Sequence, residues 1–239
     1  MASINDNIRV WNDPKSWKKF NFGEDWSKEF GSTEVLWFSY LYPRIVKFIE
    51  NSDILEIAPG TGRITKYLMQ HCNNYFGYDV SEFCVDYCTK EYGNFFAKND
   101  GKSLSHPDSS VDFIFSWDSL VHCDQEVLAD YAKESIRCLK SDGVAFIHHS
   151  NYLGSNCEDN PHWRGLSSAK EFKKDIESIG GYVIIQEFIN WDDSNRDYSD
   201  CITVFSKNKI SDYLAANNPL FYLMRSEAKN ILSSYLSIK

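Results

Sequence analysis

The chain has 239 residues, a net charge of −9 and 43% hydrophobic residues. This length allows one α/β core with extensions, and the acidic balance argues against non-specific nucleic-acid binding, which requires a basic surface. No apolar run reaches the length of a membrane span and the N-terminus lacks a signal-peptide core, so we expect a cytoplasmic protein. The seven cysteines include no CxxC pair, which favours reduced thiols over disulfides or structural zinc.

Short apolar runs alternate with helical patterns through the middle of the chain. The predicted strands are Ile54–Ala58, Tyr75–Asp79, Asn94–Ala97, Val111–Trp117 and Gly143–His149. The helical patterns are Arg63–His71, Glu82–Glu91, Gln125–Leu139 and Ser167–Ile179, and Ser81 and Asp124 are candidate N-caps. Such alternation predicts a parallel sheet that is covered on both faces. The last runs, Tyr182–Asn190 and Cys201–Phe205, are joined by a polar turn and predict an antiparallel hairpin.

The expected fold is therefore a Rossmann-like α/β domain with a seven-stranded, mostly parallel sheet that ends in an antiparallel hairpin. We expect residues 1–50 to form an N-terminal helical cap or lid, residues 51–207 to form the main domain, and residues 208–239 to form a C-terminal helical extension. Apolar residues recur in that extension, which predicts packing on the domain or on a second copy of the chain in a homodimer.

The segment ILEIAPGTGRITKYL, residues 54–68, places a tight glycine loop between a strand and a helix. A phosphate-binding loop would need Gly-Lys-Ser/Thr, but Arg63 and Ile64 follow Gly62. A dinucleotide-binding GxGxxG would need glycine at Thr65, and Pro59 removes one N–H from the loop. Glu56 ends the strand beside this loop, and its negative charge suits a sulfonium cofactor better than a polyphosphate.

Two more carboxylates follow the next two predicted strands. Asp79 ends the second strand, where a carboxylate can accept both hydroxyls of a ribose. Asp100 follows the third strand and could meet an adenine edge. Open α/β sheets bind ligands at the carboxyl ends of their strands, so Glu56, Asp79 and Asp100 together predict a nucleoside site.

These segments resemble a known family. EIAPGTGR, GYDVS, NDGKSL, VDFIFSWDSLVH and LKSDGVAFIHHSN occur in the order and spacing of class I S-adenosylmethionine-dependent methyltransferases, over about residues 53–205. The resemblance implies S-adenosylmethionine as cofactor and S-adenosylhomocysteine as product. It implies that the methionine end is lined by Glu56, Ala58, Gly60 and Gly62. It also implies that Asp79 holds the ribose and that Asp100 with Gly101 borders the adenine. Arg63 and Trp117 complete the candidate cofactor-binding set.

A second, looser resemblance concerns the acceptor. GEDWSKEFG, LYPRI, HHSN and NPHWRG look like segments of bacterial methyltransferases that modify sugars and surface polysaccharides. This implies methyl transfer to a hydroxyl of a sugar, a nucleotide-sugar or a polysaccharide unit. Two alternatives remain open: another small polar acceptor, such as a phosphate-type oxygen or an amine, and a binding protein of the same fold without catalysis.

A sugar hydroxyl is a poor nucleophile, so a general base or a metal ion would help its methylation. The catalytic candidates are Asp118 and His122 after the fourth strand, and His148 and His149 at the end of the fifth. Adjacent strand residues point to opposite faces, so we expect one of His148 and His149 to face the cleft. The Asp/His cluster could also bind a divalent metal with Asp192 and Asp193, which leaves metal dependence undecided.

Aromatic residues and one arginine are the candidates for acceptor binding. Trp163 and Arg164 lie in the connection after the fifth strand, where the planar guanidinium could hold a phosphate or carboxylate in two hydrogen bonds. The other substrate-binding candidates are Trp37, Asn151 and Trp191. Trp37 belongs to an N-terminal segment rich in tryptophan and phenylalanine, whose faces can stack on sugars and attract a sulfonium.

Overall fold

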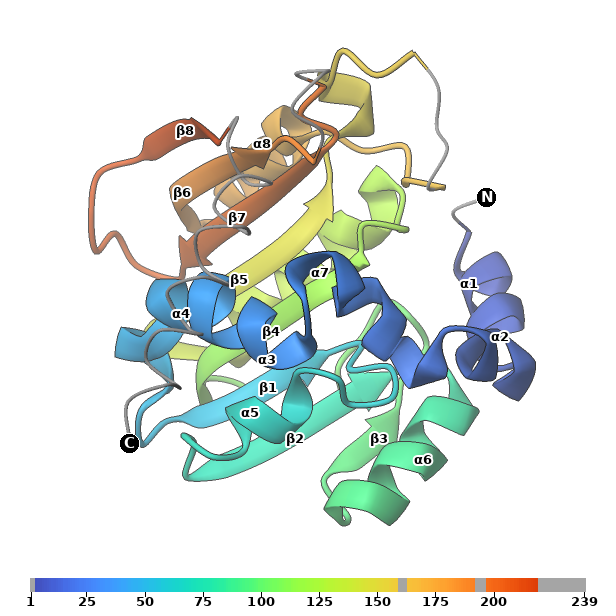
Figure 1. Cartoon of the computed structure of the whole chain (residues 1–239). Helices are drawn as coiled ribbons and strands as arrows, with labels where there is room; N and C mark the ends of the chain where they lie inside the picture. Colours follow the sequence, from blue (N-terminus) through green and yellow to red (C-terminus); the bar gives the residue numbers. More distant parts are fainter. Residues whose placement is uncertain (1–2, 159–162, 192–196, 219–239) are drawn as a thin grey trace, which may run out of the picture.

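The computed structural model describes residues 3–158, 163–191 and 197–218. Helical elements fill the first part of the chain before the sheet begins (Figure 1). They are α1 (Ile4–Trp11), α2 (Pro14–Lys19), η1 (Asn21–Phe30), α3 (Thr33–Leu36), η2 (Trp37–Leu41) and α4 (Tyr42–Ile49). Within the described ranges, no helix combines the length and the apolar character that crossing a membrane requires.

The sheet has eight strands in the order β3-β2-β1-β4-β5-β7-β6-β8. The strands are β1 (Asp53–Ile57), β2 (Asn74–Asp79), β3 (Phe96–Lys98), β4 (Val111–Leu120), β5 (Leu139–Ser150), β6 (Tyr182–Ile189), β7 (Asp200–Ser206) and β8 (Leu214–Asn218). The first five strands pair in parallel, whereas β7 pairs antiparallel with both β5 and β6. The carboxyl ends of β1, β2 and β4 therefore meet at one edge of the sheet.

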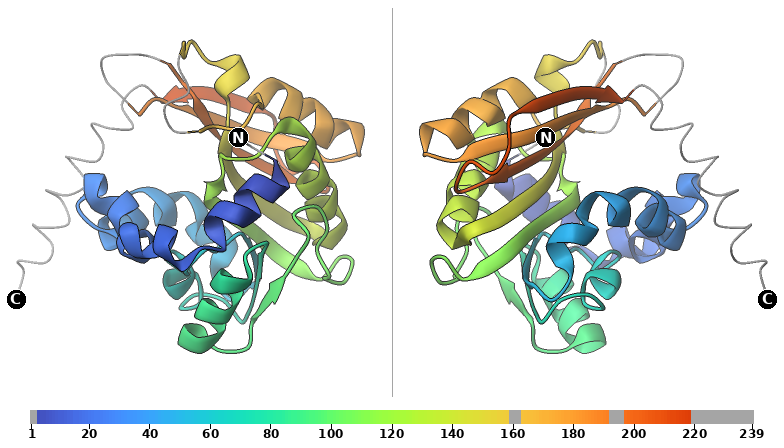
Figure 2. Two further views of the ribbon diagram at one scale, coloured as in Figure 1. Left: turned by 90° about the vertical axis from the view of Figure 1, so that its right-hand side faces the viewer. Right: turned by 90° about the vertical axis from the view of Figure 1, so that its left-hand side faces the viewer.

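Helices cover both faces of this sheet (Figures 1 and 2). The elements that connect the strands are α5 (Thr65–Leu68), α6 (Glu82–Tyr92), α7 (Gln125–Cys138), η3 (Tyr152–Gly154) and α8 (Ala169–Ser178). One core joins α4 and η2 to strand residues such as Phe113 and Phe146, and a second joins α7 and α8 to Ile114 and Ala145. Alternate strand residues point to opposite faces, so both sides of the central strands are buried.

The mostly parallel α/β fold was predicted, but the expected number of seven strands was wrong. The additional strand, β8, pairs parallel with β6 at the edge of the sheet. It occupies residues 214–218, which we had assigned to a helical extension; the remainder of that extension, residues 219–239, lies outside the described residues. The predicted helix Arg63–His71 is also shorter, because α5 keeps only Thr65–Leu68.

Residues 3–30 fold back over the carboxyl ends of the strands, as the two side views show (Figure 2). Polar contacts attach them there. Asn7 donates its side-chain N–H to the carbonyl of His122, Ser81 donates its hydroxyl to the carbonyl of Trp11, and Phe83 donates its amide to Asn12. Ser81 is also the N-cap of α6, as predicted, since its hydroxyl accepts the Cys84 amide.

Candidate functional site

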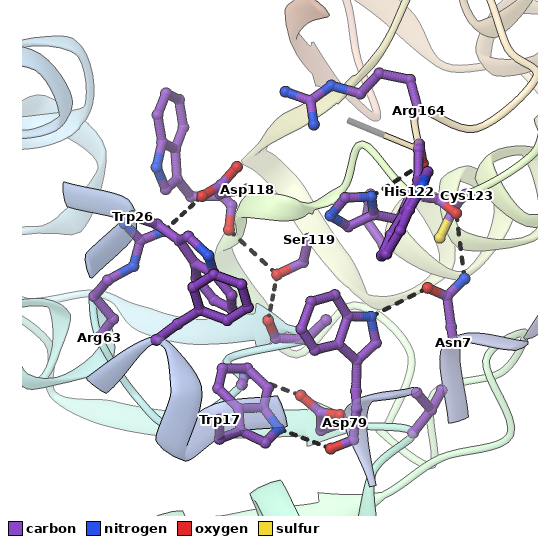
Figure 3. Close-up of a pocket in the computed structure, with 18 of the residues that line it drawn as sticks. Asn7, Trp17, Trp26, Arg63, Asp79, Asp118, Ser119, His122, Cys123 and Arg164 are labelled. Carbon is purple, nitrogen blue, oxygen red and sulfur yellow. Dashed lines mark hydrogen bonds and ion pairs between the residues drawn. The ribbon is translucent and has the colours of Figure 1, made fainter. Parts of the chain in front are cut away.

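A cavity of about 580 Å³ lies between the N-terminal elements and the carboxyl ends of the strands (Figure 3). Its size is in the usual range for small-molecule sites. One end lies over β1 and β2 and is lined by Ile4, Trp11, Trp17, Gly60, Asp79, Val80 and Gly101. The other end lies over β4, β5 and β6 and is lined mainly by Asp25, Trp26, Glu29, Phe30, Arg63, Trp117, Asp118, His122, Trp163, Arg164 and Trp191.

The glycine loop forms the floor at the β1–β2 end. Ala58, Gly60 and Gly62 have φ of 56°, 59° and 82°, in the left-handed region that glycine adopts at least cost. A Cβ on Gly60 would come within 2.6 Å of the Trp17 ring, so this position requires glycine for space as well. Ala58 occupies the position where glycine is usual, and its positive φ costs roughly 1–2 kcal/mol.

Asp79 is the carboxylate in the floor of this end. It is buried and accepts the backbone N–H groups of Gly60 (2.9 Å) and Ser81 (2.8 Å). Burial raises its pKa to about 6, although these N–H groups favour the charged form. Asp79 therefore holds the glycine loop and also lines the cavity.

Asp100 does not line the cavity. It is exposed and accepts the amides of Lys102 and Ser103 in a local turn, which directs its carboxylate away. Of the pair that we expected beside an adenine, only Gly101 lines the cavity.

Glu56 lies on β1, just before the glycine loop, and does not line the cavity. Its buried carboxylate accepts the hydroxyls of Thr65 (2.7 Å) and Tyr75 (2.5 Å). The expectation that it faces the methionine end is not met. Its geometry assigns it instead to the support of the loop that α5 follows.

The protonation of Glu56 gives a testable effect on stability. Burial raises its pKa from 4.5 to about 7, despite the hydrogen bonds from Tyr75 and Thr65. Folding thus favours the protonated acid, and this contribution to stability is complete below pH 4.5 and lost as the pH rises through about 7. Relative to Glu56→Gln, which cannot ionise, wild type should lose about 3 kcal/mol of unfolding free energy across that interval. Urea unfolding of both proteins over a pH series measures this; parallel pH profiles would contradict it.

Asp118 occupies the centre of the other end. Its φ of 59° is strained for a residue with a side chain, and such strain is common at functional sites. Its amide donates to Nδ1 of His148 (3.1 Å), and its carboxylate accepts from Arg63 (2.8 Å). Trp117, beside it, stacks on His148 with ring centroids 4.3 Å apart. Figure 3 shows the Arg63 side chain directed toward the Asp118 carboxylate in the lining of the cavity.

The two histidines of β5 point to opposite faces of the sheet, and both are buried completely. His149 accepts or donates at both ring nitrogens, to Ser150 and Thr203, and packs on Phe172 of α8. Burial lowers its pKa to about 4. The assignment of His149 as a catalytic residue is therefore wrong in physical terms, because it is a neutral core residue. His148 lies on the cavity side but is covered by Trp117.

His122 is the histidine that lines the cavity. Its Nδ1 lies 3.2 Å from the carbonyl oxygen of Trp163, which can only accept, so Nδ1 carries the proton and Nε2 keeps a lone pair. Burial, and then the positive charge of Arg164, lower its pKa below the ordinary value of 6.5. His122 is thus neutral at pH 7 and able to take up a proton.

Arg164 lines the cavity beside Trp163, whose side chain is 58% exposed. The guanidinium of Arg164 makes two hydrogen bonds to Asp200, from Nε to Oδ1 and from Nη2 to Oδ2, each 2.7 Å long. Asp200 is fully buried and also accepts the indole N–H of Trp191 (2.6 Å). The two guanidinium N–H groups of Arg164 that we expected to hold an anionic acceptor therefore donate to a carboxylate of the protein.

Two other candidate substrate-binding residues lie away from the cavity. Trp37 is fully buried and stacks on Tyr67, with ring centroids 5.4 Å apart. Asn151 is buried as well; it donates to the carbonyl of Tyr198 and accepts the amide of Ala169. Both assignments are corrected to structural roles.

Sequence reasoning missed Asp200 and the parts played by Trp17 and Trp26. Asp200 ends the polar turn WDDSNRDYSD, and no role was assigned to it from the sequence. An acid directly before the apolar run CITVF was the available signal, because the pairing of β7 with β5 begins at Asp200 and buries it. The N-terminal tryptophans were expected to belong to a cap or lid, but of these only Trp37 was named as a ligand-binding candidate, whereas Trp17 and Trp26 line the cavity.

Residues 55–147 match the family model described as "Methyltransferase domain". A search of curated proteins gives no significant match. Among solved structures, an S-adenosylmethionine-dependent methyltransferase from Leishmania major aligns with a TM-score of 0.63 and 15% identity, over 84% of this chain and 82% of its own. A TehB-like S-adenosylmethionine-dependent methyltransferase from Corynebacterium glutamicum aligns with a TM-score of 0.59 and 17% identity, over 82% of this chain and all of its own.

A third structure contains the Haloferax volcanii Trm112 methyltransferase activator and a protein described as a methyltransferase. It aligns with a TM-score of 0.61 and 16% identity, over 84% of this chain and 98% of the matched chain. At these identities the likeness concerns the fold. The chain has the class I methyltransferase fold, and the matched domain implies S-adenosylmethionine as the cofactor.

The residues of the β1–β2 end fit this cofactor. Gly60 allows close approach of the backbone, and Asp79 offers a buried carboxylate at the end of β2, where a ribose can donate two hydroxyls. Indole faces from Trp11 and Trp17 suit a sulfonium cation. Within the described ranges, no three or more of His, Cys, Asp and Glu are grouped so that they could bind a metal ion. Asp192 and Asp193 lie outside those ranges.

Proposed function

We propose that this protein transfers a methyl group from S-adenosylmethionine to a small-molecule acceptor bound at the β4–β6 end of the cavity. The observation that supports this most directly is the continuity of the cavity. It runs from Gly60 and Asp79 to Asp118 and His122 without a dividing wall of side chains, so one ligand at each end would touch the other. Holding two reactants together in this way supplies much of the rate of a displacement reaction.

The chain's own residues divide between the two ligands in this proposal. Asp79 and the glycine loop hold the nucleoside, and Arg63 links that loop to Asp118 at the acceptor end. When bound, the cofactor supplies an electrophilic methyl group on its sulfonium. In this proposal the N-terminal tryptophans cover both ligands: the Trp17 ring lies against Gly60 and packs on Trp11, and the Trp26 ring lies 5.8 Å from the Arg63 guanidinium.

The finer proposal is that the acceptor presents a hydroxyl of a sugar or glycan unit. Such a hydroxyl needs a base, and His122 meets the requirement best among the described residues that line the cavity. Its Nε2 can accept the hydroxyl proton, while the carbonyl of Trp163 fixes the ring. Asp118 acts beside it to orient the acceptor, because its carboxylate is held by Arg63. The exposed ring of Trp163 offers a face on which a sugar can stack.

The cofactor assignment is tested by the pH dependence of S-adenosylhomocysteine binding. The pKa of Asp79 is about 6, and a ribose donates best to the charged carboxylate, so affinity should rise from about pH 5 and level off near pH 7. Asp79→Asn should remove this dependence and weaken binding by about 2 kcal/mol, the scale of hydrogen bonds to a charged group. Titration calorimetry at several pH values measures both effects. Binding of NAD in place of both sulfur nucleosides would refute the assignment.

The acceptor is identified by mass spectrometry of methyl gain. The purified protein with S-adenosylmethionine is offered neutral sugars, amino sugars, nucleotide-sugars and simple amines. Methyl gain on oxygen supports the hydroxyl proposal, and gain on nitrogen supports the amine alternative. Tight cofactor binding without methyl gain on any acceptor favours the binding protein without catalysis.

A further inference from the structure

Each cation in the wall of the cavity faces a carboxylate. Among the described residues, the charged side chains of the lining are Asp25, Glu29, Arg63, Asp79, Asp118 and Arg164. Arg63 pairs with Asp118 at 2.8 Å, and Arg164 pairs with Asp200 at 2.7 Å. The two guanidinium charges are thus neutralised by carboxylates of the protein, and the lining contains more carboxylates than guanidinium groups.

Asp200 is placed to neutralise Arg164 in particular. It begins β7, next to β5, and its side chain is fully buried whereas that of Arg164 is 13% exposed. Burial raises the pKa of Asp200, but the charge of Arg164 and the nearby His148 outweigh this and hold it well below the ordinary value. Both partners therefore remain charged, and Asp200 lies behind the wall while Arg164 lies in it.

Two further residues near the acceptor lie against the same Asp200 carboxylate. The indole N–H of Trp191 donates to Oδ2 of Asp200, and Nε2 of His148 lies 3.3 Å from the same oxygen. Trp191 lines the cavity, and His148 holds the amide of Asp118. A single buried acid thus bonds Arg164 and Trp191 in the wall of the acceptor end and lies close to His148.

We propose that Asp200 is a specificity-determining residue: by neutralising Arg164, it reserves the acceptor end for an uncharged or cationic acceptor. An acceptor that carries a phosphate or carboxylate at this end is excluded, because it would compete with Asp200 for Arg164 and would face Asp118 and Asp25. The inference rests on the proposed function and narrows its acceptor class. Neutral sugars, amino sugars and amines fit, whereas a phosphorylated group next to Arg164 does not.

The tryptophans of this protein report on the charge of the cavity directly. Six of the seven, Trp11, Trp17, Trp26, Trp117, Trp163 and Trp191, line it, and the seventh, Trp37, is fully buried. Collisional quenching of tryptophan fluorescence by iodide and by caesium, at constant ionic strength and with N-acetyltryptophanamide as reference, compares the access of an anion and a cation. S-adenosylhomocysteine is added at saturation so that the acceptor end dominates the signal.

Asp200→Asn should raise quenching by iodide about twofold or more and lower quenching by caesium, because it leaves the Arg164 charge without its counter-charge. The matched control is Glu187→Gln. Glu187 lies on β6, outside the cavity lining, and accepts two hydrogen bonds from Arg44 of α4. Its substitution by glutamine changes the net charge of the protein by the same amount as Asp200→Asn. The control should leave the iodide-to-caesium ratio at the wild-type value. Equal ratios in wild type and both variants would overturn the proposal.

A second variant decides the matter if Asp200→Asn does not fold. Arg164→Met combined with Asp200→Asn removes both charges of the pair, so iodide quenching should stay as low as in wild type if Asp200 already neutralises Arg164. A clear fall in iodide quenching would show an active positive charge in the wall and would overturn the proposal. Quenching is also measured without the nucleoside, so failure of S-adenosylhomocysteine to bind would count against the proposed function alone.

Discussion

Replacing His122 with glutamine is expected to lower the rate of methyl transfer to a hydroxyl acceptor by about 10²–10⁴-fold, the usual contribution of a general base. Glutamine keeps the size and polarity of the side chain but cannot take up a proton. The site that holds the nucleoside lies at the other end of the cavity, so affinity for S-adenosylhomocysteine should be unchanged. Steady-state turnover with the acceptor identified by methyl gain, and calorimetry with the nucleoside, measure the two quantities.

The pH profile separates a base from a structural histidine. Because the pKa of His122 lies below 6.5, turnover of wild type should rise with pH below that value and then remain flat. His71→Gln is the matched control: His71 is half-buried, contacts Glu50 and lies outside the cavity lining. If His122→Gln retains full turnover while Asp118→Asn abolishes it, the base is Asp118 and the role given to His122 is wrong.

The parallel strands and the glycine loop could be predicted because their signals are local in the sequence. A strand, a glycine loop and a following helix lie within residues 54–68, and the positive φ of Gly60 and Gly62 is a property that glycine itself indicates. Asp79 was predicted for the same reason, since it directly ends an apolar strand. Asp100 was predicted to border an adenine but does not line the cavity, because the amides of Lys102 and Ser103 hold its carboxylate in a turn whose geometry the strand pattern does not encode.

The acceptor end depends on contacts between distant parts of the chain. His122 is distinguished from His148 by the carbonyl of Trp163, 41 residues away, and by the cover that Trp117 places on His148. Arg164 appeared as a free anion clamp because its partner, Asp200, is 36 residues further along and comes next to it only when β7 pairs with β5. A single sequence gives the chemical types of these residues but not their partners.

The predicted number of strands was wrong for a similar reason. The apolar residues before position 218 were interpreted as part of a helical pattern that continues to the end of the chain. The register of β8 shows that Leu214–Asn218 pairs with Ile185–Ile189 instead. Tyr213 donates its hydroxyl to Gln186, and Asn218 donates to Glu187, so side chains as well as backbone attach this edge strand. Strand pairing can override local helical preference in this way.

Asp200→Ala is expected to destabilise the protein by about 3–5 kcal/mol, the cost of breaking a buried ion pair by removing one partner. The variant leaves the Arg164 guanidinium without its two bonds to Asp200 and the Trp191 indole N–H without its bond to Asp200, and both groups are only partly exposed. Urea unfolding followed by circular dichroism measures the loss of unfolding free energy. It is carried out without S-adenosylhomocysteine, because a bound ligand would add its own stabilisation.

Two comparisons test the cause of this loss. Glu187→Ala breaks the ion pair between Glu187 and Arg44. The side chains of Arg44 and Glu187 are 21% and 16% exposed, compared with 13% and 0% for Arg164 and Asp200. Water can therefore solvate the remaining Arg44 better, and the loss of unfolding free energy should be smaller. The double variant Arg164→Met with Asp200→Ala should be more stable than Asp200→Ala alone, because no unpaired charge is left in the wall. A loss below about 1 kcal/mol for Asp200→Ala, or a double variant less stable than the single one, would mean that the pair is solvated and that Asp200 does not hold the acceptor wall in place.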